Sequence, residues 1–259
     1  MPWTPEFQLD KSSRTISLVP EDKTQLATAS ATAISRLLSA AQDAGAFAKL
    51  SNWPGEKFPV IGSPFTFAID RAIAPYFGIV TTGAQLTAFV RNEVGQIDGI
   101  WLVKRAADKP TYPGLLDNAV GGAVKHDETP FECLLREASE ELGLVAEAAV
   151  PAGTVSWFNI KDSRSGLASG LVEPGVQYVY DLEVSPEVEL RPEEPGIEWV
   201  KLLSVEETKA ALKRYEFKPS CAIVMIDFFV RHGMINAEND THFAEMIPRL
   251  HRALPLPVI

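Results

Sequence analysis

The stretch GGAVKHDETPFECLLREASEELGL, residues 121–144, decides the fold of the region around it. Thr129, Pro130 and Glu132 stand where an N-cap, a first-turn proline and a capping-box glutamate belong, so a helix should begin there. Apolar residues then recur at helical spacing until Gly143, which can end the helix in a left-handed conformation. The pattern predicts an amphipathic helix with one face packed inward. Its apolar positions are Phe131, Leu134, Leu135, Ala138 and Leu142.

Three glutamates gather on one side of this predicted helix. Glu137, Glu140 and Glu141 lie at positions i, i+3 and i+4, where side chains are neighbours and like charges repel. A cation is therefore expected between them. Clustered hard oxygen ligands suit Mg²⁺ or Mn²⁺ rather than zinc, and Mg²⁺ commonly binds a few carboxylates together with substrate phosphates. The spacing predicts a divalent-metal site that acts on a phosphate ester or anhydride.

The same stretch carries a resemblance to a known family. Glycines, one arginine and four glutamates at fixed spacing resemble a complete Nudix box. The alternative is an ordinary surface helix with a solvated acidic face, which a match at so many fixed positions disfavours. The matching residues are Gly122, Glu128, Arg136, Glu137, Ala138, Glu140, Glu141, Gly143 and Leu144.

Segments outside the box resemble one branch of that superfamily, the Nudix proteins related to thiamine pyrophosphokinase. The resemblance implies an α/β fold, a Nudix α/β/α sandwich with a mixed sheet at residues 91–259, after a small α+β accessory domain at residues 1–90. It also implies Mg²⁺-dependent hydrolysis of a small organic diphosphate, foremost the damaged oxo and oxy forms of thiamine diphosphate, to the monophosphate and phosphate. The segments are WLVKRAADKPTYPGLLDNAVGG (101–122), VQYVYDLEV (176–184) and YEFKPSCAIVMIDFFVRHGMI (215–235).

The resemblance also implies roles for residues of the box. Glu137, Glu140 and Glu141 are the implied metal ligands, together with Gly122, whose backbone bends beside the site. Glu137 or Glu140 would also orient or deprotonate the attacking water. Arg136 is placed in the active site, where its spacing from the glutamates favours fixing their carboxylates over touching substrate. Mg²⁺ is the implied cofactor, with Mn²⁺ as a substitute.

Five further charged residues are weaker candidates. Lys104 and Arg105 end a predicted strand that leads into the box, so either could reach the diphosphate, although exposed strand-end charges are equally common. Glu128 could bind metal or pair with the box arginine, and its simpler role is a favourable charge near a helix N-terminus. Glu193 and Glu194 precede a predicted strand where some Nudix enzymes supply another ligand or base, although an acidic loop is the simpler interpretation.

Apolar periodicity and turn residues predict the remaining elements. A helix is expected within residues 23–50, with Ile34, Leu37, Leu38 and Ala41 on its apolar face, and a break at Trp53, Pro54 and Gly55. Strands at 86–90 and 99–104 should form a hairpin, near which the domain boundary is placed. Further strands are expected at 155–160, 176–184 and 197–202. A helix is expected at 205–214, after the capping box of Ser204 and Glu207. Two more helices are expected, at 219–231 and from about Glu238 to His251 after Asn236.

Composition narrows the class of protein. A formal charge of −10 argues against a general nucleic-acid binder, and 46% hydrophobic residues can build a globular core. No apolar run reaches the ~20 residues that span a bilayer, and the N-terminus lacks signal or transit features, so a cytoplasmic protein without a membrane partner is expected. Cys133 and Cys221 should be buried apolar side chains. The four histidines, at 126, 232, 242 and 251, lack metal-ligand spacing.

The sequence is compatible with two other functions. One is a Nudix hydrolase of a nucleoside diphosphate derivative such as ADP-ribose. The other is a non-catalytic diphosphate-binding module on the same scaffold, whose usual sign would be lost box glutamates. An isopentenyl-diphosphate isomerase is disfavoured because residues 115–122 offer no cysteine as the acid. Five aromatic residues could stack on a substrate ring, although most should fill the core: Trp101, Trp157, Phe158, Tyr178 and Tyr180.

Overall fold

The computed structural model describes residues 2–46, 57–165 and 170–258. The chain divides into two compact units, Met1–Ile79 with Leu256–Ile259, and Val80–Pro255. Our predicted boundary near residue 90 stays a prediction, and the strand that begins at Thr81 belongs to the second unit. The expected helix break at residues 53–55 lies outside the described residues.

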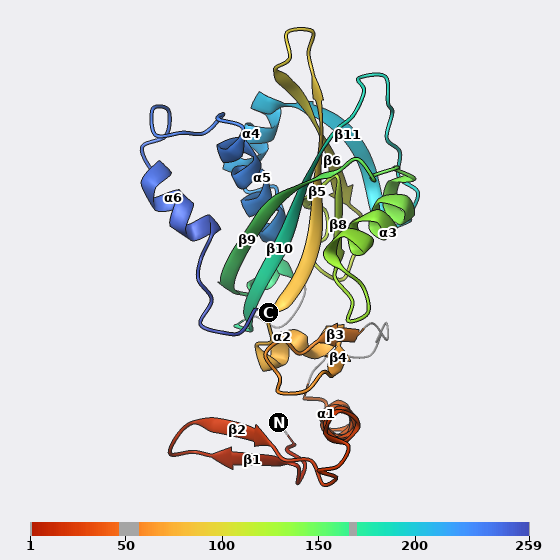
Figure 1. Cartoon of the computed structure of the whole chain (residues 1–259), viewed down its shortest axis with the longest axis vertical. Coiled ribbons are helices and arrows are strands. Elements are labelled where there is room, and N and C mark those ends of the chain that lie inside the picture. The colour runs from red at the N-terminus through yellow and green to blue at the C-terminus, as the bar shows by residue number, and fades with distance from the viewer. Residues whose placement is uncertain (1, 47–56, 166–169, 259) are drawn as a thin grey trace. The chain divides into compact units, whose positions relative to one another are not determined.

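The first unit combines short strands with one long helix (Figure 1). Helix α1, Leu26–Asp43, buries the predicted apolar positions, among them Leu37 and Ala41, which are fully buried. The other elements are β1 (Phe7–Asp10) paired with β2 (Thr15–Leu18), β3 (Lys57–Pro59) paired with β4 (Ala68–Asp70), a 3-10 turn at Arg71–Ile73, and α2 (Ala74–Phe77).

The second unit is built on a mixed sheet of seven of the described strands. The predicted hairpin is confirmed in β5 and β6, both longer than expected, and β10 then pairs in parallel with β5 and antiparallel with β9. Strand β10 starts at Val172, earlier than the predicted start at residue 176. The strands are β5 (Thr81–Arg91), β6 (Ile97–Arg105), β7 (Leu116–Asn118), β8 (Val120–Ala123), β9 (Val150–Ile160), β10 (Val172–Glu183) and β11 (Ile197–Ser204).

Helices cover both faces of this sheet and give the expected α/β/α layering (Figure 1). On one face α3 (Pro130–Leu142) packs on β8 and β5. On the other face α5 (Pro219–Arg231) buries Met225, Phe228 and Phe229 completely, as its apolar sequence predicted. Helix α4 (Val205–Lys213) begins at the predicted capping box and packs beside α5.

The last helix is shorter than predicted. Helix α6 spans Phe243–Leu250, whereas the sequence suggested a start near Glu238 after Asn236. Side chains in this segment bind backbone N–H groups in turns instead: Asn239 accepts from Asn236 N at 2.9 Å, and Asn236 accepts from Glu238 N at 2.9 Å. Such local bonds compete with helix formation, so the helix starts later.

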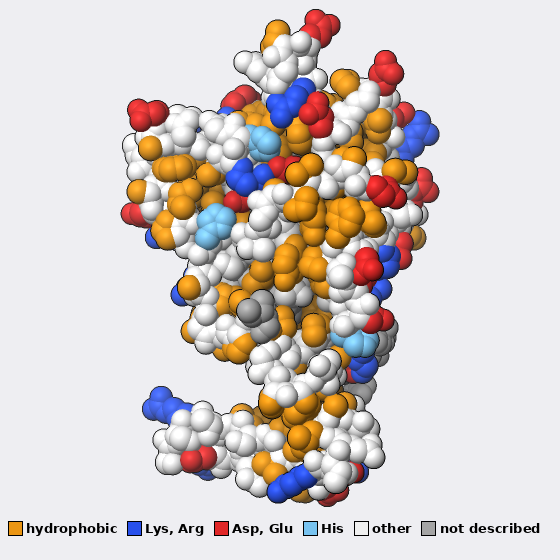
Figure 2. Space-filling model, in the orientation of Figure 1, with side chains coloured by type: hydrophobic (Ala, Val, Ile, Leu, Met, Phe, Trp, Pro, Cys, Tyr) orange, Lys and Arg blue, Asp and Glu red, His pale blue; other side chains and the backbone are white. Residues whose placement is uncertain are grey.

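The predicted core is largely confirmed. Trp101, Trp157 and Tyr180 are buried, whereas Tyr178 and Phe158 are only partly buried. At the surface, Figure 2 shows apolar side chains gathered over the middle of the second unit. Among the helices described, none is long and apolar enough to cross a bilayer.

Candidate active site

Helix α3 fixes the position of the box glutamates. Thr129 Oγ1 accepts a hydrogen bond from Glu132 N at 3.3 Å, and Glu132 Oε2 accepts one from Thr129 N at 2.8 Å, so the predicted capping box is formed. Gly143 ends the helix with φ of 58°, a left-handed conformation that glycine adopts without strain. Both ends of the helix are therefore set by the residues that the sequence singled out.

Arg136 holds three carboxylates at once. Its Nη2 and Nε donate to the two oxygens of Glu128 at 2.9 and 3.0 Å, a bidentate pair. Its Nη1 donates to Glu137 at 2.8 Å and to Glu140 at 3.1 Å. Burial opposes ionisation of Glu128, but the bonds from Arg136 and from Lys125 N outweigh it and lower the pKa of this carboxyl. The guanidinium of Arg136 thus lies against two of the three glutamates between which a cation was expected, Glu137 and Glu140.

Gly122 makes room for Glu137. A Cβ on Gly122 would lie 2.3 Å from Glu137 Cγ and 2.5 Å from its Oε1, far inside van der Waals contact. The Glu137 side chain therefore lies directly against the backbone of β8. Any side chain at position 122 would push this carboxylate out of place.

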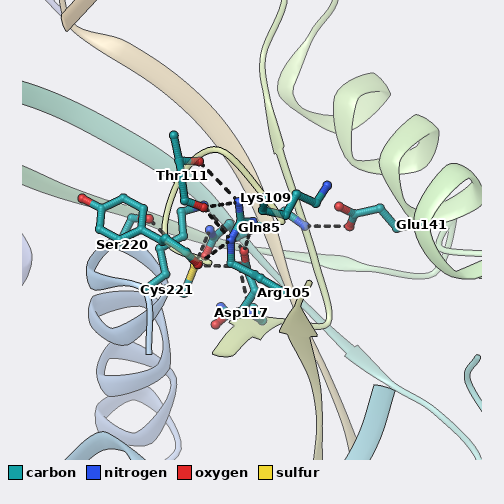
Figure 3. A network of polar contacts seen from close by, with 12 residues as sticks. Gln85, Arg105, Lys109, Thr111, Asp117, Glu141, Ser220 and Cys221 are labelled. Atoms are coloured by element: carbon teal, nitrogen blue, oxygen red, sulfur yellow. Dashed lines mark hydrogen bonds and ion pairs between the residues drawn. The ribbon is translucent and has the colours of Figure 1, made fainter. Parts of the chain in front are cut away.

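The surroundings of Glu141 disfavour its ionised form. Its Oε2 accepts a hydrogen bond of 3.3 Å from Gly121 N (Figure 3). The pKa of Glu141 is raised well above its ordinary value, because the carboxylate is removed from water and because other acidic side chains lie nearby. These neighbours are Asp117, Glu137 and Glu194.

The donor set fits a divalent cation. Hard carboxylate oxygens on one helix face, with excess negative charge around Glu141, are the surroundings that Mg²⁺ or Mn²⁺ would stabilise. Within the described residues, no three His, Cys, Asp or Glu side chains are grouped closely enough to enclose a metal ion. Arg136 accounts for this, because two of the three glutamates are turned toward its guanidinium.

The two basic candidates are engaged elsewhere. Lys104 Nζ binds Glu198 Oε1 at 2.9 Å across the β6–β11 pair. Arg105 donates to Asp117 Oδ2 at 3.1 Å and to the Thr111 carbonyl at 2.8 Å, as drawn in Figure 3. Arg105 thus shapes the loop between β6 and β7, and its role as a diphosphate ligand stays a prediction, as does that of Lys104.

The two acidic candidates before β11 lie beside the end of α3. Glu193 N donates to the Glu141 carbonyl at 2.9 Å, and its side chain lies against Gly143. Glu194 Oε1 binds Lys109 Nζ at 2.9 Å. The structure therefore brings this loop to the helix that carries the box.

Sequence reasoning missed a buried polar cluster around Asp117. Cys221 Sγ donates to Asp117 Oδ1 at 2.6 Å and accepts from Gln85 Nε2 at 3.2 Å (Figure 3). Burial and the Asp117 carboxylate raise the pKa of the Cys221 thiol to about 12, so this cysteine stays protonated. The available signal was Asp117 itself, a charge within an apolar run four residues before Gly121. Both cysteines are buried and free, as predicted.

Comparison with known proteins identifies related sequences. Residues 82–221 match the family described as NUDIX domain. The Saccharomyces cerevisiae protein YJR142W is 34% identical over 219 residues, which cover 81% of this chain and 64% of the relative. Nudix hydrolase 20, chloroplastic, of Arabidopsis thaliana is 30% identical over 224 residues, which cover 85% of this chain and 56% of the relative.

The crystal structure of DR0079 from Deinococcus radiodurans is similar at 25% identity with a TM-score of 0.41, over 57% of this chain and 83% of that one. The chain spans between about half and two thirds of the length of the two curated relatives, at 64% and 56%.

Proposed function

The chain belongs to the NUDIX domain family, and on this premise we propose that it hydrolyses phosphoric anhydrides with the help of a divalent cation. The observation that carries the proposal is the box itself, in which three glutamates project from one helix whose two ends are fixed. The acidic side chains of Asp117, Glu137 and Glu194 around Glu141 support a cationic partner. A non-catalytic module would usually have lost box glutamates, whereas Glu137, Glu140 and Glu141 are all present, which favours an enzyme.

Each residue of the box has a role in this proposal. A bound divalent cation supplies charge neutralisation on the phosphate oxygens and lowers the pKa of bound water. Glu137, Glu140 and Glu141 would hold it, together with the backbone at Gly122. Glu137 or Glu140 would also accept the proton of the attacking water.

Arg136 is a positioning residue in this proposal. Its bonds to Glu128, Glu137 and Glu140 keep the carboxylates preorganised, which limits the rearrangement needed when substrate arrives. Glu128 would act through Arg136, which engages both of its oxygens.

The substrate we propose is a small organic diphosphate, foremost the oxo or oxy form of thiamine diphosphate. Support comes from the segments around residues 101–122, 176–184 and 215–235, which resemble the thiamine pyrophosphokinase-related branch. The products would be the monophosphate and inorganic phosphate. Discrimination of tenfold against another diphosphate requires only ~1.4 kcal/mol of differential transition-state binding, within reach of one hydrogen bond to the altered ring.

The test is a substrate panel measured as phosphate or monophosphate release. The panel contains thiamine diphosphate, its oxo and oxy forms, ADP-ribose and nucleoside triphosphates, each with Mg²⁺, with Mn²⁺ and after removal of metal with EDTA. We expect a metal-dependent reaction whose rate rises toward alkaline pH, with the highest kcat/KM on the oxidised thiamine diphosphates. A higher kcat/KM for ADP-ribose would overturn the substrate, and full activity without metal would overturn the mechanism.

A further inference from the structure

The loop between β6 and β7 is tied to the end of α3 through the segment before β11. Ala106 N, at the start of the loop, donates to the Gly196 carbonyl at 3.0 Å. In the same segment Glu193 N donates to the Glu141 carbonyl at 2.9 Å. A side chain on the loop is therefore held near the box glutamates.

Lys109 is the side chain of this loop that lies near the box glutamates. Its Nζ binds Glu194 Oε1 at 2.9 Å, and Gly196 lies so close that a Cβ there would be 1.9 Å from Nζ. The aliphatic part of the Lys109 side chain thus packs on the backbone of Gly196, where there is no side chain. Figure 3 shows Lys109 on the Glu141 side of the polar network.

The surroundings of this ammonium are those of the candidate metal site. Glu194, its partner, directly follows Glu193, whose backbone N donates to the Glu141 carbonyl at 2.9 Å. The neighbouring cations have more hydrogen-bond partners than Lys109 has. Arg136 binds three carboxylates, and Arg105 binds Asp117 and loop carbonyls. The Lys109–Glu194 pair is about 30% exposed, at 28% and 32%, and ion pairs with such exposure stabilise little, so exchange of the partner is easy.

We propose that Lys109 binds the diphosphate of the substrate, exchanging the Glu194 carboxylate for a phosphate oxygen. This inference rests on the proposed function, because it names a residue that contacts the substrate of that same site. An ammonium is a compact charge with three donors on a flexible stem, which suits a phosphate group that arrives in more than one orientation. Lys109 contacts a part of the substrate that is anionic before and during the reaction, so it contributes mainly to binding.

The experiment compares Lys109→Met with Lys109→Arg and with a matched control, Lys209→Met. Methionine keeps most of the stem over Gly196 and removes the charge. Lys209 is 27% exposed and binds Glu206 at 3.1 Å on α4, so it resembles Lys109 in burial and pairing. Circular dichroism and thermal unfolding establish that each variant folds, and Lys109→Ala replaces the methionine variant if that one does not.

Two readouts are measured. The first is KM and kcat on the best diphosphate of the substrate panel. The second is the affinity for imidodiphosphate, a non-hydrolysable diphosphate, by calorimetry with Mg²⁺. We expect Lys109→Met to raise KM and weaken imidodiphosphate binding about tenfold, with kcat changed less than about threefold. Lys109→Arg should retain binding within about threefold, and Lys209→Met should match the wild type.

The two proposals fail in different ways. If the wild type hydrolyses diphosphates and Lys109→Met behaves as Lys209→Met does in both readouts, the role of Lys109 is overturned and the hydrolase remains. If the wild type hydrolyses no anhydride, the proposed function fails, while the calorimetric comparison still decides whether Lys109 binds a diphosphate. A wild type that binds no imidodiphosphate overturns the Lys109 proposal as well.

Discussion

The carboxylate of Glu128 and the guanidinium of Arg136 form a bidentate pair, with bonds of 2.9 Å from Nη2 and 3.0 Å from Nε. Glu128 lies in the loop before α3 and Arg136 lies within the helix, so the pair fastens the loop to the helix. Glu128 also accepts a bond from Lys125 N at 2.9 Å, which extends the connection toward β8. The geometry depends on the fork of an arginine, which a lysine cannot reproduce.

Arg136→Lys should therefore impair both stability and activity although the charge is kept. We expect a loss of about 1–2 kcal/mol in the free energy of unfolding, from bonds to charged groups, and a fall in kcat of about tenfold or more. Urea unfolding and steady-state kinetics measure the two effects. Arg91→Lys is the control, since Arg91 binds Glu183 through Nε alone. Equal effects of both substitutions would argue that the bidentate pair has no special role.

Glu140→Gln and Glu141→Gln test the box carboxylates directly. Each substitution keeps the shape of the side chain and removes a charge proposed to hold the cation. We expect kcat to fall by ~10²-fold or more with the fold intact. Glu147→Gln, an exposed position after α3, serves as the control. Turnover at wild-type rates in both box variants would refute the assignment.

Gly122→Ala tests the close approach of Glu137 to β8. The new Cβ would lie 2.3 Å from Glu137 Cγ, so the carboxylate must move. Overpacking of this kind costs about 1–3 kcal/mol of stability, and kcat should fall at least about tenfold because the site depends on this geometry. Gly121→Ala is the comparison, since its nearest atom, Gln85 Nε2, would be 3.3 Å away. A smaller effect at 122 than at 121 would contradict the steric argument.

Glu141→Gln should also change how stability depends on pH when metal is absent. The pKa of Glu141 is raised in the folded state, so between its ordinary value of 4.5 and the raised value the folded chain binds more protons than the unfolded chain. Stability contributed by this group is therefore lost as pH rises through that window. In EDTA, the variant should gain melting temperature relative to wild type as pH increases from 4 to 9. A difference that stays constant with pH would show that the pKa of Glu141 is the same in the folded and the unfolded chain.

Local features of the fold were predictable from sequence because their determinants lie within one helical turn. The capping boxes of Thr129 with Glu132 and of Ser204 with Glu207 each join residues three apart, and both are formed as predicted. Pro219 starts α5 for the same local reason, since proline suits a first helical turn.

Contacts between distant segments could not be predicted in this way. Lys109 and Glu194 are 85 residues apart, and Cys221 and Asp117 are 104 apart, so only the folded sheet brings them together. Arg105 shows the same limit: its strand-end position suggested either a diphosphate ligand or an exposed charge, whereas its guanidinium donates to Asp117 and the Thr111 carbonyl. The sequence shows which side chains are charged or polar, whereas their interaction partners depend on the tertiary structure.

The parallel pairing of β5 with β10 bears on the order in which this unit can assemble. Residues 81–89 pair with residues 175–183, so one edge of β5 has no neighbour until the chain has been made almost a hundred residues further. Closing so large a loop is slow, and an unpaired edge with many apolar side chains invites association with other chains. Newly synthesised chains should therefore be most prone to aggregate before β10 leaves the ribosome, and a chaperone that covers β5 in that interval would raise the yield of folded protein.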